Sequence, residues 1–195
     1  MAVRVSVGFT SDMTDLPELI HCGQMVLRRT RVADAGRIAA AVAESLDHLR
    51  PYLPWATEEA GTVEAQRARL AVDEQSWPEG SAYTYLLVGT EPDPVTGPVL
   101  GLVGVHRRIG PGGLEICYWV HAKHARRGLI SAAVKAVTDA ALALPEVSRV
   151  EIHCDVTNVA SAGVPRKLGY RLARVEQQER LAPADTGRQQ IWIYP

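Results

Sequence analysis

The sequence predicts an α/β fold, with one domain in which helices flank a mixed, mostly antiparallel sheet. The chain has 195 residues, 47% hydrophobic and 22% charged, which suits one globular domain with a full core. Strand-like and helix-like stretches follow each other in the order β-α-α-β-β-β-α-β-α-β-β. The early strands pair most simply as antiparallel hairpins, whereas the later β-α-β unit requires a parallel pair.

The start of the chain divides into an arm and a first strand. Residues 1–23 show no regular pattern and are expected to form an irregular N-terminal arm, so the domain is expected to span residues 24–195. Residues 24–29 alternate in polarity, which predicts a strand. The arm lacks the basic start and the apolar run of a signal peptide. No apolar run in the sequence is long enough to span a membrane.

Two helices are expected next. The first covers residues 33–49, where apolar residues recur at helical spacing, at Ile38, Val42, Leu46 and Leu49. Pro51 and Pro54 prevent its continuation. Thr62 is a suitable N-cap for the second helix, which is expected to end near Trp77 because Pro78 follows.

Turn-forming residues separate the remaining elements. Strands over residues 83–90 and 99–108 flank a proline-rich segment and are expected to form a hairpin. Further strands are expected over residues 114–120, 147–155, 170–181 and 188–194. Helices are expected over residues 128–144 and 158–168, and no internal repeat or linker divides the chain.

Charge and cysteine content exclude several classes of protein. The net charge is −1, so no overall field draws the chain to nucleic acid or to an anionic membrane. The three cysteines, Cys22, Cys117 and Cys154, are odd in number and match no zinc motif, so no metal site is expected. Reduced thiols inside apolar segments behave as small hydrophobic groups, which indicates a cytoplasmic protein.

The segment Ala125-Arg126-Arg127-Gly128-Leu129-Ile130-Ser131 carries the strongest chemical signal. It joins the predicted strand over residues 114–120 to the predicted helix over residues 128–144. A basic, glycine-containing turn at a helix start offers free backbone N–H groups and the positive end of the helix dipole. The segment therefore predicts a phosphate site, whereas the simpler alternative is a helix start with two solvated arginines.

The order of elements and four motifs together resemble the GNAT acetyltransferase superfamily. The resemblance is strongest to the branch of Rim-type N-terminal acetyltransferases of ribosomal proteins, and it covers residues 25–181. The motifs are Leu27-Arg28-Arg29 with Asp34-Ala35, Glu115 to Val120, Arg127-Gly128-Leu129, and Asn158-Val159-Ala160-Ser161 with Lys167-Leu168-Gly169-Tyr170. The last two are specific in combination, whereas either alone would be weak.

The resemblance implies acetyl-CoA as a co-substrate and no metal. The pyrophosphate would lie on the N–H groups of the turn that opens the expected helix over residues 128–144. The pantetheine amides would pair with the splayed end of the strand over residues 114–120, where a backbone N–H would polarise the thioester carbonyl. The implied cofactor residues are Trp119, Val120, His121, Arg126, Arg127, Gly128, Leu129, Ile130, Ser131 and Asn158.

The resemblance also implies two catalytic side chains. Many relatives use a tyrosine seven residues after the asparagine to protonate the leaving thiolate, but Pro165 occupies that place here. Ser161 is the expected acid instead, and its alternative role is to form a helix cap with Asn158. Glu115 is the expected base, acting through water, and its alternative is an ordinary strand-face glutamate.

Three histidines, His106, His121 and His153, lie on or beside predicted strands. Each is ranked below Glu115 as a base, because histidines in such places are more often structural. No arrangement of side chains points to a covalent enzyme intermediate, so direct attack of an amine on the thioester is expected.

The turn departs from the family pattern in three places. Ala125 and Arg126 stand where glutamine or arginine and then glycine are usual, and Ile130 replaces a small residue. Because an arginine disfavours left-handed backbone, the loop is expected to be shaped differently or to bind less tightly. These departures keep open a non-catalytic CoA-binding regulatory module.

The expected acceptor is the N-terminal α-amine of a protein or peptide. An α-amine with a pKa near ~7.8 is about one-third neutral at pH ~7.5, whereas a lysine amine near ~10.4 is only about 0.1% neutral. The segment Leu49 to Trp55 could line the acceptor site or form a packed connector. The alternative acceptors are small amines: an amino acid, a polyamine or an aminoglycoside.

Two further points stay open at this level. A longer acyl donor, such as succinyl-CoA, is compatible with the motifs. A homodimer is implied by the resemblance alone, and Trp192 and Tyr194 could cover either the core or a dimer face.

Overall fold

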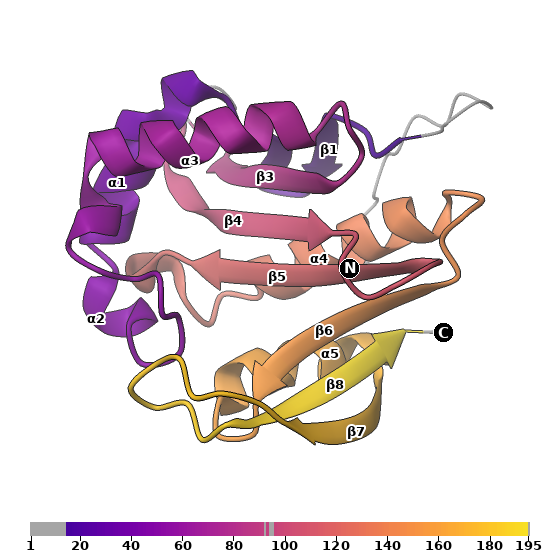
Figure 1. Ribbon diagram of the computed structural model, residues 1–195. Helices are drawn as coiled ribbons and strands as arrows, with labels where there is room; N and C mark the ends of the chain where they lie inside the picture. Colours follow the sequence, from indigo (N-terminus) through magenta and orange to yellow (C-terminus); the bar gives the residue numbers. More distant parts are fainter. Residues whose placement is uncertain (1–14, 92, 94–95, 195) are drawn as a thin grey trace.

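The computed structural model describes residues 15–91, 93 and 96–194, and within them eight strands form one sheet (Figure 1). The strands are β1 (Leu19–Cys22), β2 (Met25–Arg29), β3 (Ala82–Gly89), β4 (Val99–His106), β5 (Gly113–Val120), β6 (Arg149–Asp155), β7 (Arg171–Gln177) and β8 (Arg188–Tyr194). Their order across the sheet is β1-β2-β3-β4-β5-β6-β8-β7. Every neighbouring pair is antiparallel except β5 and β6, so the expected mixed, mostly antiparallel sheet is confirmed.

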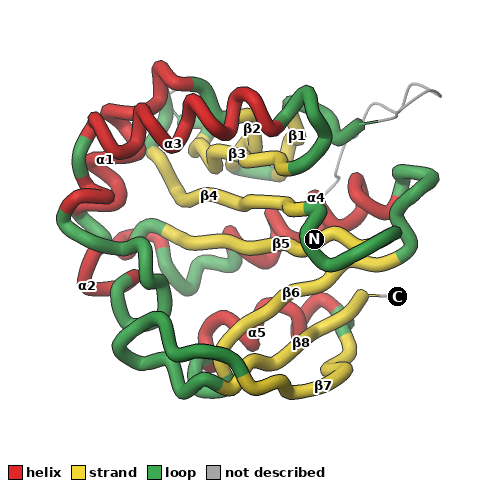
Figure 2. The backbone as a smooth tube through the Cα atoms, in the orientation of Figure 1, coloured by secondary structure: helices red, strands yellow, loops and turns green. Residues whose placement is uncertain are grey.

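Helices cover both faces of this sheet (Figure 2). They are α1 (Ala35–Ala43), α2 (Leu46–Leu49), α3 (Val63–Ser76), α4 (Leu129–Leu142) and α5 (Val159–Leu168), with 3-10 turns η1 (Val32–Asp34), η2 (Glu59–Gly61) and η3 (Ala122–His124). α1 and α3 lie on one face, and α4 and α5 lie on the other. Across the described parts of the chain, no helix combines the length and apolar character that a membrane span requires.

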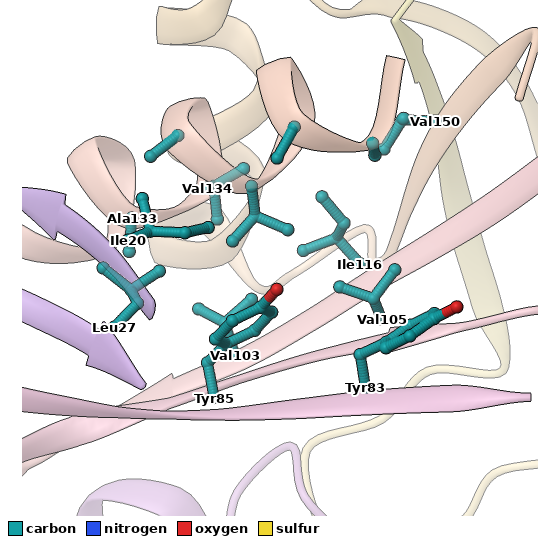
Figure 3. Packing of buried hydrophobic residues seen from close by; sticks show 14 of the residues in the cluster. Ile20, Leu27, Tyr83, Tyr85, Val103, Val105, Ile116, Ala133, Val134 and Val150 are labelled. Carbon is teal, nitrogen blue, oxygen red and sulfur yellow. The ribbon is translucent and has the colours of Figure 1, made fainter. Parts of the chain in front are cut away.

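Alternation along the central strands gives the sheet two apolar faces. Val103 and Val105 of β4 pack beneath Val134 of α4 in the larger core, as Figure 3 shows. Leu102, the neighbour of Val103, points to the other face and packs with Ile38 of α1 in a second core. Trp192 is buried in the larger core, which is the first of the two alternatives, core or dimer face, that the sequence left open for it.

The parallel pair β5–β6 is short, and this creates an opening in the sheet. Their ladder covers only Gly113, Leu114 and Glu115 of β5. Beyond Glu115, β5 continues to pair with β4 and β6 pairs with β8, so the carboxyl ends of β5 and β6 diverge (Figure 1). One backbone edge of β5 at residues 116–120 therefore faces this opening, as the pantetheine hypothesis requires.

The N-terminal segment differs from the expectation. Residues 19–22, expected to be irregular, form β1 and pair antiparallel with β2. Gly23, with φ 61°, makes the tight turn between them, because glycine adopts left-handed backbone without strain. Residues 1–14 of the expected arm lie outside the described residues. At the other end, β7 stops at Gln177, earlier than the expected residue 181.

The expected helix over residues 33–49 is broken into α1 and α2. Ser45 interrupts it with φ −117° and ψ 3°. The Ser45 side chain is buried, and its Oγ accepts a hydrogen bond from Ala122 N at 3.1 Å. This bond ties the break to the turn that follows β5.

Candidate active site

The segment ahead of α4 forms a turn suited to anions. Gly128 has φ 79° and caps α4, and the first hydrogen bond of the helix runs from Ala132 N to Gly128 O at 3.0 Å. The N–H groups of Leu129, Ile130 and Ser131 come before that bond, so they have no acceptor within the helix. They lie together with the positive end of the helix dipole at the turn.

Arg126 adopts a backbone conformation that glycine usually supplies. Its φ is 60°, so Arg126 adopts the left-handed region although arginine disfavours it, and weaker binding by the loop stays a prediction. Left-handed backbone costs a non-glycine residue about 1–2 kcal/mol. The loop thus holds strain two residues before Gly128, and such strain concentrates at ligand-binding segments.

The end of β5 places its backbone at the opening in the sheet and its side chains in the two cores and in the turn that follows. The Trp119 ring lies 6.2 Å from the Trp55 ring on the α1–α3 face. Val120 packs against the larger core. The His121 imidazole is buried, and its Nδ1 accepts a hydrogen bond from Lys123 N at 3.2 Å, which caps η3. His121 thus has a structural side chain, and its backbone N–H donates to Leu100 O at 2.9 Å.

The start of α5 brings Ser161 to β5. Asn158 caps the helix, because its Oδ1 accepts a hydrogen bond from Ser161 N at 3.0 Å. The Ser161 hydroxyl lies 3.2 Å from the Tyr118 hydroxyl, which also donates to Ser161 O at 3.0 Å. Burial raises the pKa of Tyr118 well above its usual range, so it stays protonated. Sequence reasoning did not assign Tyr118, since only folding brings β5 and α5 together.

Glu115 is held by an ion pair. Both of its carboxylate oxygens accept from Arg108, at 2.6 and 2.7 Å. Although burial opposes the effect, the hydrogen bonds and charge of Arg108 lower the pKa of Glu115. His153 Nδ1 lies 3.9 Å from Glu115 Oε1, and its Nε2 lies 2.7 Å from a carboxylate oxygen of Glu151. Glu115 and His153 thus belong to a charged network on the sheet face.

A cavity of about 260 Å³ opens on the α1–α3 face of β3, β4 and β5. Its apolar wall consists of Ile38, Val42, Leu53, Trp55, Leu102 and Trp119. Its polar wall consists of Gln66, Arg69, Asp73, Thr84, His106 and Cys117, with Gly104 and Tyr118 completing the lining. Leu53 and Trp55 belong to the predicted acceptor segment. The residues from α3, and those from β4 other than His106, escaped sequence reasoning, because no local pattern joins these distant segments.

The segment after α2 closes the same side of the molecule. Ala184 N donates to Pro51 O at 2.8 Å, and the Tyr52 hydroxyl donates to Thr157 O at 3.0 Å. These bonds join the α2–α3 connector to the β7–β8 loop and to the start of α5, which are far apart in sequence (Figure 1). The connector therefore has the packing contacts of one predicted role and also lines the cavity, while its contact with an acceptor stays a prediction.

No group of three or more metal-ligating side chains lies together anywhere in the described residues. The cysteines Cys22, Cys117 and Cys154 are free thiols. Atoms packed around the sulfur raise the pKa of Cys117 to about 11, and burial raises that of Cys154 to about 11.

Comparison with known proteins bears on this arrangement. A sequence search of curated proteins finds no match. Among solved structures, RimL, the ribosomal L7/L12 α-N-protein acetyltransferase in complex with coenzyme A, superposes with a TM-score of 0.81 at 19% identity, over 91% of this chain and 97% of that one. The ribosomal-protein-S5-alanine acetyltransferase from Vibrio fischeri gives 0.80 at 17% identity, over 90% and 95%.

A third similar structure is the microcin C7 self-immunity acetyltransferase MccE in complex with acetyl-CoA and AMP, with a TM-score of 0.81 at 14% identity over 94% of this chain and 99% of that one. At these identities the similarity establishes the fold alone. The family model for the acetyltransferase (GNAT) domain matches residues 24–171. The protein is therefore a member of the GNAT acetyltransferase family.

Proposed function

We propose that this protein transfers an acetyl group from acetyl-CoA to the N-terminal α-amine of a protein or peptide. The observation that carries the proposal is the divergence of β5 from β6 beside the anion-binding turn, with a lined cavity on the other face of β5. Backbone groups at this opening suit the cofactor, and the cavity suits an acceptor. Structures named as acetyltransferases of ribosomal proteins share the fold and support this acceptor class.

The cofactor contacts are mainly backbone groups. The N–H groups of residues 126–131 would bind the pyrophosphate, and Arg126 and Arg127 would add positive charge. The pantetheine amides would pair with the open edge of β5 at residues 119–120, as an added strand does, while the His121 N–H is already bonded to Leu100 O. Asn158 supports the site by capping α5 and so placing Ser161.

The acceptor would enter the cavity on the α1–α3 face. Trp55 and Trp119 offer an apolar wall. Asp73, ion-paired with Arg69 through one carboxylate oxygen, offers its other carboxylate oxygen to an amine. Arg69 Nη2 is buried and has no hydrogen-bond partner among the described residues, so this donor suits a peptide carbonyl of the acceptor. A cavity of about 260 Å³ admits the first side chain of a peptide better than a large drug-like amine.

The chemistry requires no covalent enzyme intermediate. The neutral amine attacks the thioester carbonyl, a backbone N–H of β5 stabilises the developing oxyanion, and the carbon–sulfur bond breaks. Ser161 would donate a proton to the leaving thiolate. The Tyr118 hydroxyl, 3.2 Å from Ser161 Oγ, can donate in place of Ser161. Glu115 would accept the amine's proton only through water, and its pairing with Arg108 makes it a weak base.

Acetylation of matched peptides tests the proposal. One set has free N-termini and no lysine, and the other has blocked N-termini and one lysine. We expect mass spectrometry to show acetylation of the first set at least 100-fold faster, because far more of an α-amine is neutral near pH ~7.5. Equal or faster acetylation of the blocked set would contradict the acceptor assignment. Binding of acetyl-CoA without turnover on any amine would support the regulatory-module alternative, and preference for succinyl-CoA would correct the donor.

We also propose a cytoplasmic location and a homodimer. The odd number of free thiols supports a reducing compartment. β7 is an edge strand of the sheet, and its Leu172 and Val175 are each 43% exposed, which supports self-association there. Light scattering after size-exclusion chromatography should give twice the monomer mass, and a monomer would contradict the dimer.

A further inference from the structure

His106 lies over a glycine on the wall of the cavity. His106 and Gly104 are two residues apart on β4, so both point to the α1–α3 face. A Cβ built on Gly104 would lie 2.9 Å from His106 Nε2 and 2.9 Å from Cys117 Sγ. The missing side chain of Gly104 is therefore what allows the imidazole to fold back along the strand and approach Cys117.

This position places the imidazole next to the reacting segment of β5. His106 Nε2 lies 3.4 Å from Cys117 Sγ, and Gly104 and Cys117 are register partners of β4 and β5. Cys117 directly precedes Tyr118 and Trp119, which belong to the β5 segment that would hold the thioester. His106 and Cys117 also line the cavity that would hold the acceptor amine.

The protonation states favour proton acceptance at Nε2. Because burial raises the pKa of Cys117 to about 11, its thiol keeps its hydrogen and can donate it to His106 Nε2. In that tautomer Nε2 is the unprotonated ring nitrogen. Burial and then the charge of Arg108 lower the pKa of His106 below its usual 6.5, with Glu115 opposing, so the imidazole is neutral near pH ~7.5.

The charged groups around His106 are paired with each other. Arg108, just after the end of β4, and Glu115 of β5 form one ion pair. From α3, Arg69 and Asp73 form another, at 2.8 Å. The imidazole between them has no carboxylate of its own among the contacts of the described residues, unlike His153, which is bound to Glu151.

We propose that His106 is the catalytic residue that takes the proton from the acceptor amine, at Nε2, directly or through one water. This rests on the proposed acetyl transfer. As the nitrogen–carbon bond forms and the carbon–sulfur bond breaks, the amine proton moves to His106, and Ser161 Oγ gives its proton to the thiolate and regains one from solvent. His106 then releases its proton to solvent. Glu115, held by Arg108, is a neighbour that stabilises the protonated imidazole.

His106→Gln tests this, with His153→Gln as the matched control. We expect kcat on an N-terminal peptide to fall about 100-fold or more in His106→Gln, the usual scale for loss of a general base. Acetyl-CoA affinity, measured by calorimetry, should stay within about twofold of the wild type, and His153→Gln should keep kcat within about threefold. Imidazole added to His106→Ala should restore part of the rate.

A pH profile of the wild type gives a second, independent measurement. With saturating peptide, kcat should decline below a pKa under 6.5, because protonated His106 cannot accept a proton, and this decline should vanish in His106→Gln. If Glu115 were the base, the decline would lie below 4.5. An active wild type whose His106→Gln variant keeps its rate would overturn this inference. A wild type that acetylates no α-amine would instead overturn the proposed function.

Discussion

Under the proposed function, the two sides of β5 would recognise their ligands by different means. On the side of the opening, the groups offered to the cofactor would be backbone N–H groups of the turn and the unpaired edge of β5. On the cavity side, the groups are side chains from α1, α3, the connector, β4 and β5. Backbone recognition tolerates substitution, which is why the turn keeps its form with Arg126 in place of glycine. Recognition by side chains does not tolerate substitution in this way. Substitutions should therefore change the choice of acceptor more easily than the choice of cofactor.

Among the variants that separate the two sides of β5, Ser161→Ala gives the largest expected effect, because we place Ser161 in the chemistry on the opening side. It should lower kcat about 30-fold with little change in acetyl-CoA affinity, less than the ~100-fold or more usual for a general acid, because the Tyr118 hydroxyl lies 3.2 Å from Ser161 Oγ and can donate instead. Steady-state kinetics on the N-terminal peptide measures this. Ser148→Ala, an exposed serine at the start of β6, is the control. An unchanged kcat would leave Ser161 with a purely structural role at the start of α5.

Trp55 tests the cavity side. Trp55→Ala removes the partner of Trp119 and part of the cavity wall, so kcat/KM for the peptide should fall about 10-fold, the scale of one aromatic pair. Acetyl-CoA affinity should not change. Val72→Ala, at a 61% exposed position of α3, should leave both values unaltered. Equal losses for peptide and cofactor would mean that the two sides are not separable.

Arg126 gives the smallest effect and separates strain from charge. Arg126→Gly should raise the free energy of unfolding by up to about 1 kcal/mol, because the left-handed strain is relieved, with part of the gain lost to chain entropy. Acetyl-CoA affinity should fall about threefold at low salt because a positive charge is lost. At high salt, where charges are screened, the difference from the wild type should be smaller. Arg127→Ala should show the affinity change without stabilisation. Denaturant unfolding and calorimetry measure both, and a destabilised Arg126→Gly would show that no strain was present.

The same contrast explains what the sequence could predict. The turn before α4, the capping role of Asn158 and the course of β5 depend on residues adjacent in the chain, and their patterns were sufficient. β1 could have been found, because Gly23 follows Leu19 to Cys22 and marks a hairpin turn. The break at Ser45 could not, because its cause is a hydrogen bond to Ala122, distant in sequence.

The acceptor side was beyond prediction for the same reason. Nothing near His106 in the sequence shows that its imidazole meets Cys117 across two strands, over the space that Gly104 leaves. Likewise, α3 is largely polar, and only packing shows that Arg69 and Asp73 face the cavity. The pairing of Glu115 with Arg108, which weakens Glu115 as a base, also depends on the strand register that brings β4 and β5 together.

The most direct test of the central claim is calorimetric binding of acetyl-CoA to the wild type and to Gly128→Pro. Proline cannot adopt the φ of 79° found at Gly128 and lacks the N–H, so the turn should lose its form. We expect micromolar binding by the wild type and a loss of about 100-fold or more in the variant, with the fold checked by circular dichroism. No binding by a folded wild type, or equal binding by a folded Gly128→Pro, would contradict the assignment of this turn to the cofactor.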